Sequence, residues 1–524
     1  MKCMNLAAIA AFFASASPTL AADLEVATLT PVKSTEFATK HDDTTAIVLH
    51  HIVEGLVAYD SNLDVQPLLA KSVSVSDDGR VYTFALRDDV IFHNGERMTA
   101  AEVVWNWRRF ADPKRDWGSH CREWYDGSAE GYHRPVRIVS IEAPNDATVV
   151  ITLQSKNALF LDLVASNHCI SGIVHPDSVD EDGAWIKPIG TGPYMLESAD
   201  LSGPVRLTRF AAYAARSEPR DGFAGDRTAL ADTLTFTHFK NFDTAKAAFD
   251  AGAIHAIVNA PFAGTRGLRD RDGVTVHWQQ TPAWHQLIIQ TRTDPLLADV
   301  RIRHAIDLAI DERAITKAVF GGDAVANPSA VYFASPFHTE NHGKGLGYDT
   351  KRAKALLTEA GYAGEPIEIQ ASRDPYPTFH AIAEEAAKMM RKVGLNAHVK
   401  EMSWPDQDEH YGSNKYQMTS ITFSLRTDPS LMYSTLAGQK ADHSWYLWED
   451  NEAAAITAYS TVVDAPEDRQ ALFDSLHEKM ITWTPTIGIC NTPRFHIVSD
   501  QVDGFEAWAL GIPRFWGVSV TTGE

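Results

Sequence analysis

Apolar and polar positions alternate in several short stretches of the chain, as they do in half-buried β-strands. Residues 81 to 86 (VYTFAL) have this period of two, and so do residues 147 to 153 (ATVVITL). The segment GTGPYML at residues 190 to 196 is a glycine-proline turn that leads into another apolar run. We predict a strand in each of these three places.

The first of these strands leads through a turn into a helix. Asn94-Gly95 is a turn signal. Thr99 precedes Glu102 by three residues, the spacing of a capping box, in which each side chain accepts a hydrogen bond from the other residue's backbone amide. We therefore predict that a helix begins after Thr99, and the segment up to residue 113 has the character of scaffold.

From Val300 onward, apolar residues recur at helical spacing. The run VRIRHAIDLAIDERAITKAVF predicts one helix that Gly321-Gly322 ends. A second helix is predicted after Asp349, a suitable N-cap, and closes at Gly361. The segments IEIQAS, HAIAEEAAKMMRKVG and NAHVKEMSW then read as strand, helix and strand, which is typical of an α/β lobe.

Length and charge limit the possible classes of protein. A chain of 524 residues is too long for one core, and the usual size of roughly 100 to 200 residues per domain predicts two to four domains. Asp and Glu outnumber Lys and Arg 68 to 47, giving a net charge of -21. Binding of nucleic acid requires a surplus of positive charge, so we expect no nucleic-acid partner.

The N-terminus has the three parts of a secretory signal. Lys2 supplies the positive charge, residues 6 to 16 an apolar run too short to span a bilayer, and Thr19-Leu20-Ala21-Ala22 a small-residue cleavage site. We expect cleavage near Ala21 or Ala22 and a soluble periplasmic protein. Cys3 stands before the apolar run and does not resemble a lipoprotein cysteine, so no lipid anchor is expected.

Five segments, in order, resemble the family 5 extracellular solute-binding proteins of bacterial ABC importers, which include oligopeptide-, dipeptide- and nickel-binding proteins. The first is QPLLAKSVSVSDDGRVYTFALRDDVIFHNGERMTAAEVVWNWRR, and the second is GTGPYML. The others are DVRIRHAIDLAIDERAITKAVFGGDA, GYDTKRAKALLTEAGY and residues 367 to 404.

The resemblance implies an α/β fold of the type II periplasmic binding protein class. Two lobes close on a ligand, and an additional domain is inserted in the first lobe. Carried onto this chain, the first lobe covers residues 23–66, 190–288 and 496–524, the additional domain 67–189, and the second lobe 289–495. The lobes would be joined by strands, so no flexible linker is expected. Permease subunits of an ABC importer are the implied partners, and we expect a monomer.

Cysteine usage follows from the compartment and these domains. In an oxidising compartment two of Cys121, Cys169 and Cys490 are expected to pair. Cys121 and Cys169 fall in the same implied domain, so we predict a disulfide between them. Cys490 lies in the strand-like TIGIC, where burial as a small apolar residue is the simplest expectation.

The segment ITFSLRTDPSLMY, residues 421 to 433, departs from the peptide-binding members of the family. Those members hold an acidic residue there that pairs with the ligand's amino terminus; Leu425 stands in its place, followed by Arg426, and Asp428 matches the end of their motif. A guanidinium offers a planar fork for a carboxylate, a phosphate or sugar hydroxyls. Pairing of Arg426 with Asp428 or another internal acid is the structural alternative.

Aromatic residues in segments that border the family's cleft are the other candidate ligand contacts, because flat apolar faces suit sugar rings. Trp404 follows a strand end directly, which is where ligands bind in α/β sheets, and Trp284 and His285 precede the strand QLIIQT. Packing in the core is the alternative for each tryptophan. The remaining candidates are Trp278, Trp445 and Trp448.

These features favour a solute-binding protein for an opine-like compound, a sugar conjugate or an oligosaccharide. Peptide binding within the same family is the first alternative. A secreted hydrolase is another, but no GxSxG, HExxH or phosphate-loop motif is present. A metal carrier is the third, but the 21 histidines show no clustered ligand spacing. We expect neither catalytic residues nor a cofactor.

Overall fold

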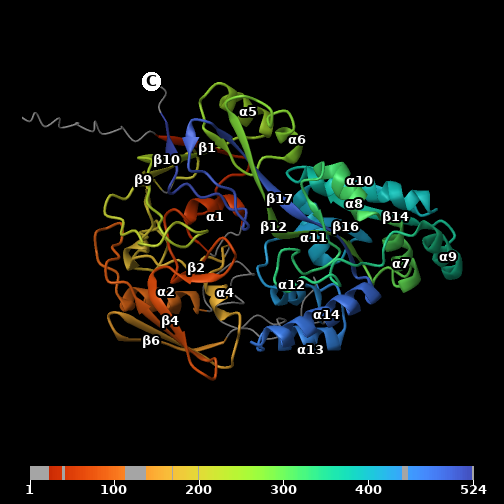
Figure 1. Ribbon diagram of the computed structural model, residues 1–524, viewed down its shortest axis with the longest axis horizontal. Coiled ribbons are helices and arrows are strands. Elements are labelled where there is room, and N and C mark those ends of the chain that lie inside the picture. The colour runs from red at the N-terminus through yellow and green to blue at the C-terminus, as the bar shows by residue number, and fades with distance from the viewer. Residues whose placement is uncertain are drawn as a thin grey trace, which may run out of the picture.

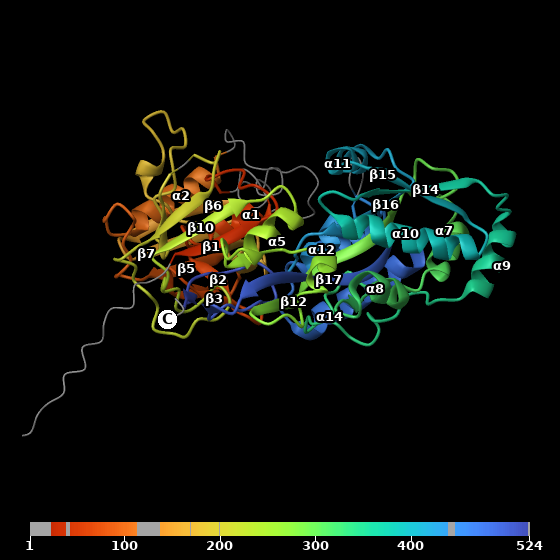
Figure 2. The ribbon, with the colours of Figure 1, turned by 90° about the horizontal axis from the view of Figure 1, so that it is seen from above.

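The computed structural model describes residues 23–37, 42–112, 137–167, 169–198, 200–438 and 446–521. Figures 1 and 2 show two lobes side by side, with the red to yellow segments in one and the green to blue segments mainly in the other. A single mixed sheet of 11 strands runs through both lobes in the order β15-β14-β16-β12-β17-β11-β1-β10-β9-β8, with β13 paired to β17. Its strands are β1 (Leu24–Thr28), β8 (Tyr194–Leu196), β9 (Val205–Arg209), β10 (Thr233–His238), β11 (Ala256–Ile257), β12 (Val274–Ile289), β13 (Val325–Ala326), β14 (Pro366–Ser372), β15 (Asn396–Met402), β16 (Met418–Phe423) and β17 (Thr486–Ser499).

The two longest strands, β12 and β17, join the lobes as an antiparallel pair (Figure 1). Their pairing is irregular between Gln280 and Trp284, where Pro282 has no amide to donate to the ladder. We use "first lobe" for the described residues 23–260 and 498–521, and "second lobe" for those of 284–490. The expectation that strands connect the lobes is confirmed.

The first lobe contains a second, four-stranded antiparallel sheet in the order β4-β5-β7-β6. The predicted capping box of Thr99 and Glu102 is present at the start of the helix α2, and Gly95 occupies the predicted turn with a φ of 89°. The helices and strands of the first lobe outside the large sheet are β4 (Ala70–Val75), β5 (Val81–Leu86), β6 (Ile138–Asn145), β7 (Thr148–Leu153), α1 (Asp43–Leu49), α2 (Ala100–Phe110), α4 (Phe160–Val164) and α5 (Phe242–Asp250), with β2 (Val57–Tyr59), β3 (Val65–Pro67), the 3-10 turn η1 (Pro176–Ser178), β18 (Val502–Asp503) and β19 (Ser519–Val520). The short helix α6 (Phe262–Thr265) lies between this lobe and β12 in the chain.

The second lobe confirms the predicted strand-helix-strand unit. Strands β14 and β15 are parallel and α10 connects them, with β16 parallel to β14 on its other side. The helices of this lobe are α7 (Val300–Ala309), α8 (Glu312–Phe320), α9 (Thr350–Ala360), α10 (Pro377–Lys392), α11 (Trp404–Ser413), α12 (Pro429–Leu436), α13 (Asn451–Ser460) and α14 (Pro466–Trp483).

One helix prediction was wrong in length. The run from Val300 to Phe320 forms two helices, because Ile310 takes an extended conformation and the Asp311 side chain accepts a hydrogen bond from the amide of Ala314. Asp311 therefore caps a new helix. The predicted stop is correct, since Gly321 adopts a left-handed conformation with a φ of 63°.

The predicted boundaries of the additional domain and the lobes stay a prediction. Buried side chains of residues 67–189, such as Phe84 and Val149, belong to the same apolar core as Leu24 and Phe236. Within the described ranges, no helix combines the length and apolar character that crossing a bilayer requires.

Candidate functional site

The carboxyl ends of three parallel strands form one edge of the sheet in the second lobe. Ser372 at the end of β14 is in register with Met402 at the end of β15, and β16 runs in the same direction beside β14. The loops after these strands carry Tyr376, Trp404 and residues 424–428. We call this region the strand-end edge, and such edges are where open α/β sheets bind ligands.

The strand-end edge faces the first lobe. The hydroxyls of Tyr59 in β2 and Thr427 lie 2.8 Å apart. Burial raises the pKa of Tyr376, and among the nearby charges Asp43, the first residue of α1, raises it further. A ligand held at this edge would therefore lie between elements of both lobes.

Leu425 and Arg426 sit in the loop after β16. The Leu425 side chain is buried, at 5% exposure, so it offers an apolar surface in place of an acid. Arg426 is partly buried, and its Nη1 donates hydrogen bonds to Ser424 Oγ at 2.8 Å and to the carbonyl oxygen of Leu425 at 3.2 Å. These hydrogen bonds hold the guanidinium of Arg426 close to the loop that carries it.

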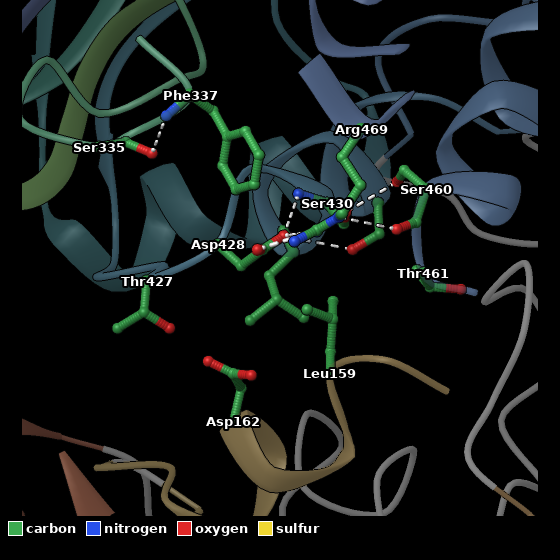
Figure 3. Close-up of polar contacts among 12 residues, drawn as sticks. Leu159, Asp162, Ser335, Phe337, Thr427, Asp428, Ser430, Ser460, Thr461 and Arg469 are labelled. Carbon is green, nitrogen blue, oxygen red and sulfur yellow. Dashed lines mark hydrogen bonds and ion pairs between the residues drawn. The ribbon is translucent and has the colours of Figure 1, made fainter. Parts of the chain in front are cut away.

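Asp428 forms a buried ion pair with Arg469 of α14. Nη2 of Arg469 lies 2.7 and 2.9 Å from the two carboxylate oxygens, and it also donates to Ser430 Oγ at 3.0 Å. The same carboxylate caps α12 by accepting from the amide of Ser430 (Figure 3). Asp428, which was predicted as a ligand contact, is thus engaged in fixing the loop between β16 and α12. Its ion-pair partner is Arg469 and not Arg426.

The predicted tryptophans lie in different surroundings. Trp284 is buried at 1% exposure, with Nε1 donating to the carbonyl oxygen of Asn327 at 3.0 Å, and Trp448 is fully buried. Trp404 begins α11 and is partly buried, with its ring 5.1 Å from that of Tyr376. Trp278 is 40% exposed and stacks on Phe495. Among the predicted tryptophans that the structure describes, Trp404 is therefore the one at the strand-end edge.

His285 lies inside the sheet. Its two ring nitrogens are 2.8 Å from Thr422 Oγ1 and 2.9 Å from Ser420 Oγ, both on the neighbouring strand β16. Burial lowers the pKa of His285 to about 3, so the ring is neutral at physiological pH. These contacts satisfy both nitrogens without a ligand. Trp445 lies outside the described residues.

Three residues at the junction of the lobes were missed by the sequence reasoning: Tyr59, Asp162 and Tyr376. Tyr376 lies in the short loop between the end of β14 and the start of α10, so the strand-end argument used for Trp404 would have found it. Tyr59 and Asp162 carry no such signal, because they meet Thr427 and Asp428 only through folding.

Among the described residues, one group of histidine and carboxylates has atoms close enough to hold a metal ion: Glu96, His175 and Asp177. Nε2 of His175 is 3.2 Å from Glu96 Oε2, and Nδ1 accepts a hydrogen bond from the amide of Asp177 at 3.2 Å. His175 thereby caps the 3-10 turn η1, and this structural role accounts for its position.

The cysteine predictions have different outcomes. Cys490 is a free, buried thiol in β17, as expected, and burial raises its pKa to about 12. Cys169 is buried, but Cys121 lies outside the described residues. The disulfide between Cys121 and Cys169 therefore stays a prediction.

The chain is similar to several solute-binding proteins. It is 26% identical over 399 residues to the glutathione-binding protein GsiB of Salmonella typhi, covering 74% of this chain and 71% of that one. Among solved structures, CtaP of Listeria monocytogenes, an ABC transporter substrate-binding protein, has a TM-score of 0.82 at 19% identity, covering 96% of this chain and 100% of that chain.

Two further structures share the fold and were solved with ligands. AgaA from A. tumefaciens R10, in complex with agropinic acid, has a TM-score of 0.75 at 20% identity, with 96% of this chain and 99% of that chain covered. DppA of Helicobacter pylori, in complex with the peptide STSA, has a TM-score of 0.75 at 21% identity, with 95% and 98% covered. The model of the family "Bacterial extracellular solute-binding proteins, family 5 Middle" matches residues 64–444, and this chain belongs to the family 5 bacterial extracellular solute-binding proteins.

Proposed function

We propose that this protein is the periplasmic component of an ABC importer and captures a small polar organic solute between its two lobes. The family supports a solute-binding role, and the strand-end edge lies against the first lobe. The paired strands β12 and β17 join the lobes and would allow them to open and close around that edge. In this proposal the signal peptide is removed near Ala21 or Ala22, which lie outside the described residues.

The ligand class rests on one observation, the replacement of the amine-binding acid by a buried leucine. Leu425 gives an ammonium group no charged partner, whereas the neighbouring Arg426 is a cation that carboxylates, phosphates or hydroxyls can bridge. We therefore propose an opine-like compound, a sugar conjugate or an oligosaccharide. AgaA was solved with agropinic acid and shares the fold of this chain, and that shared fold is the extent of its support for an opine-like ligand.

The proposed ligand contacts are Arg426, Trp404 and, by the same strand-end argument, Tyr376. Trp404 and Tyr376 contact each other at the edge and offer aromatic faces. Trp278 keeps an exposed ring but lies on β12 beside Phe495. Four other candidates are explained as structural residues by their burial or by contacts within the protein: Asp428, Trp284, His285 and Trp448.

A peptide ligand is the second candidate, because DppA of Helicobacter pylori was solved with a peptide and shares the fold. The two candidates differ in what Arg426 does. An anionic or hydroxyl-rich solute would need its guanidinium, whereas a peptide held through its amino terminus would not.

Binding assays on the mature protein distinguish them. Thermal-shift screening against peptides and against anionic and sugar-derived solutes should identify a solute that raises the melting temperature, since a ligand that binds only the folded state stabilises it. Calorimetry with that solute should show Arg426→Ala weakening binding by about 1.5 to 3 kcal/mol, the contribution of a hydrogen bond to a charged group.

Two controls accompany this test. Arg352→Ala removes an exposed arginine on α9 that pairs with Glu359, and it should leave affinity unchanged. Leu425→Asp alone should not create tight peptide binding, because the other residues of the strand-end edge are unaltered. Submicromolar binding of a peptide that survives Arg426→Ala would contradict the ligand class, and turnover of the bound solute would contradict the binding role.

A further inference from the structure

The two lobes touch at a polar contact beside the strand-end edge. The Tyr59 and Thr427 hydroxyls lie 2.8 Å apart, and the amide of Ala158 donates to the carbonyl oxygen of Thr461 at 2.7 Å. Lys156 forms an ion pair with Asp464. We call this contact the latch, and its members are Tyr59, Lys156, Ala158 and Asp162 in the first lobe and Thr427, Asp428, Thr461 and Asp464 in the second.

Asp162, in α4, is the member of the latch whose charge is least compensated. Tyr59 Oη lies 3.1 Å from its backbone oxygen and 3.3 Å from its Oδ1. Its carboxylate points toward Thr427 and Asp428 across the contact (Figure 3). In the described part of the chain, no Lys or Arg lies within ion-pair distance of Asp162. The nearby cation Arg469 forms its ion pair with Asp428 instead.

The tyrosine hydroxyl has one proton to donate. When it donates to Oδ1 of Asp162, the Thr427 hydroxyl donates in turn to the tyrosine oxygen. One chain of hydrogen bonds thus runs from the second lobe to the carboxyl group of Asp162 in the first lobe. The separation of the lobes would break this chain at Thr427.

The charged and titratable groups that face Asp162 come from four places: Tyr59 in β2, Tyr82 in β5, Asp428 at the start of α12 and Arg469 in α14. Burial and then Asp428 raise the pKa of Asp162 to about 7, while the hydrogen bond from Tyr59 and the charge of Arg469 act in the opposite direction. Tyr82, in β5, lies close enough for the charges of Asp464 and Asp162 to raise its own pKa, after burial. Burial and the Asp428 carboxylate, which raise the pKa of Asp162, therefore outweigh the Arg469 cation, which lowers it.

We propose that the latch is sensitive to protons: the lobes come together with the carboxyl group of Asp162 protonated, and loss of that proton loosens the contact. The inference concerns the contact between lobes, goes beyond the proposed solute-binding role and does not depend on which solute is bound.

The direction of the pH effect follows from proton linkage. When the lobes separate, Asp162 regains water and its ordinary pKa of about 4. The touching state thus binds more protons than the separated state between about pH 4 and pH 7. The latch is strongest below this window, weakens as pH rises through it and changes no further above it.

Hydrogen exchange of the mature protein without added solute tests the proposal. The Ala158 amide reports the latch directly, because its hydrogen bond crosses between lobes. After correction for the intrinsic exchange rate, its protection should be about thirtyfold higher at pH 5.5 than at pH 8.5, while amides of β7 should show no such difference. Wild-type protection that is equal at both pH values would overturn the proposal.

Two variants make the test specific. Asp162→Asn keeps the shape of the side chain and should hold the latch at high protection at both pH values. Asp182→Asn, a change at an exposed acid of the same lobe, should behave as wild type. An Asp162→Asn protein with the wild-type pH dependence would show that another group takes up the proton, and would overturn the proposal.

A change in the second lobe covers the case in which Asp162→Asn does not fold. Thr427→Val removes the hydroxyl that meets Tyr59 but leaves Asp162 facing Asp428. Protection of Ala158 should fall at both pH values while its pH dependence remains. A Thr427→Val protein without any pH dependence would count against Asp162 as the source.

Discussion

At the scale of single residues, two tryptophans on the same strand show how strongly surroundings decide a role. Trp284 and Trp278 both lie in β12, six positions apart, with the irregular pairing after Gln280 between them. Trp284 is 1% exposed and donates a hydrogen bond to Asn327, whereas Trp278 is 40% exposed and rests on Phe495. The sequence pattern predicts both as ligand contacts, with packing in the core as the alternative for each.

We expect truncation of the two side chains to have unequal effects. Trp284→Ala leaves a cavity in the core of the second lobe and an unpaired carbonyl oxygen, so unfolding free energy should fall by about 3 to 5 kcal/mol. Trp278→Ala should cost about 1 kcal/mol or less, since much of its ring is already in water. Urea denaturation of the two variants and wild type, without solute, measures both. Equal losses would contradict the assignment of Trp284 to the core.

At the scale of elements, a single side chain divides what the apolar pattern predicts as one helix. The pattern from Val300 to Phe320 is continuous, because α7 and α8 both face the same core. Asp311 interrupts the backbone by accepting from the amide of Ala314, and Ile310 before it is extended. Hydrophobic spacing reports which face is buried and does not report whether the backbone is continuous.

Removing this cap should destabilise the second lobe measurably. Asp311→Ala leaves the amide of Ala314 in α8 without its acceptor, and the loss of an N-cap costs about 0.5 to 2 kcal/mol. Arg313→Ala, an exposed change within the same helix, should stay within about 0.5 kcal/mol of wild type. Thermal or urea unfolding provides both values. A neutral Asp311→Ala change would mean that packing alone starts α8.

At the scale of the whole molecule, the latch and the paired strands define how the lobes can move. β12 and β17 pass between the lobes, while Tyr59 and Ala158 contact Thr427 and Thr461 on the opposite side of the junction. Opening would keep the strands intact and break the latch. Under the proposal that the solute binds at the strand-end edge, its entry requires release of the latch.

A disulfide across the latch tests this. The amide of Ala158 and the carbonyl of Thr461 are 2.7 Å apart, which places the two backbones near the Cα separation of about 4.4 to 6.8 Å that a disulfide spans. The oxidised Ala158→Cys/Thr461→Cys protein should lose binding of the solute found by thermal-shift screening, and reduction should restore it. Either single variant serves as the control. Undiminished binding by the oxidised double variant would show that the latch does not need to open.

The sequence by itself determined the local elements and the family. The capping box at Thr99, the stop at Gly321 and the strand-helix-strand order of residues 366–402 depend on neighbours along the chain, so a linear pattern predicts them. It also placed Trp404 just after a strand. Only the tertiary structure decided which side chains meet: Tyr59 and Thr427 are 368 residues apart, and Asp428 takes Arg469 as its partner. Such contacts depend on packing and burial between distant segments, for which the linear pattern of the chain holds no signal.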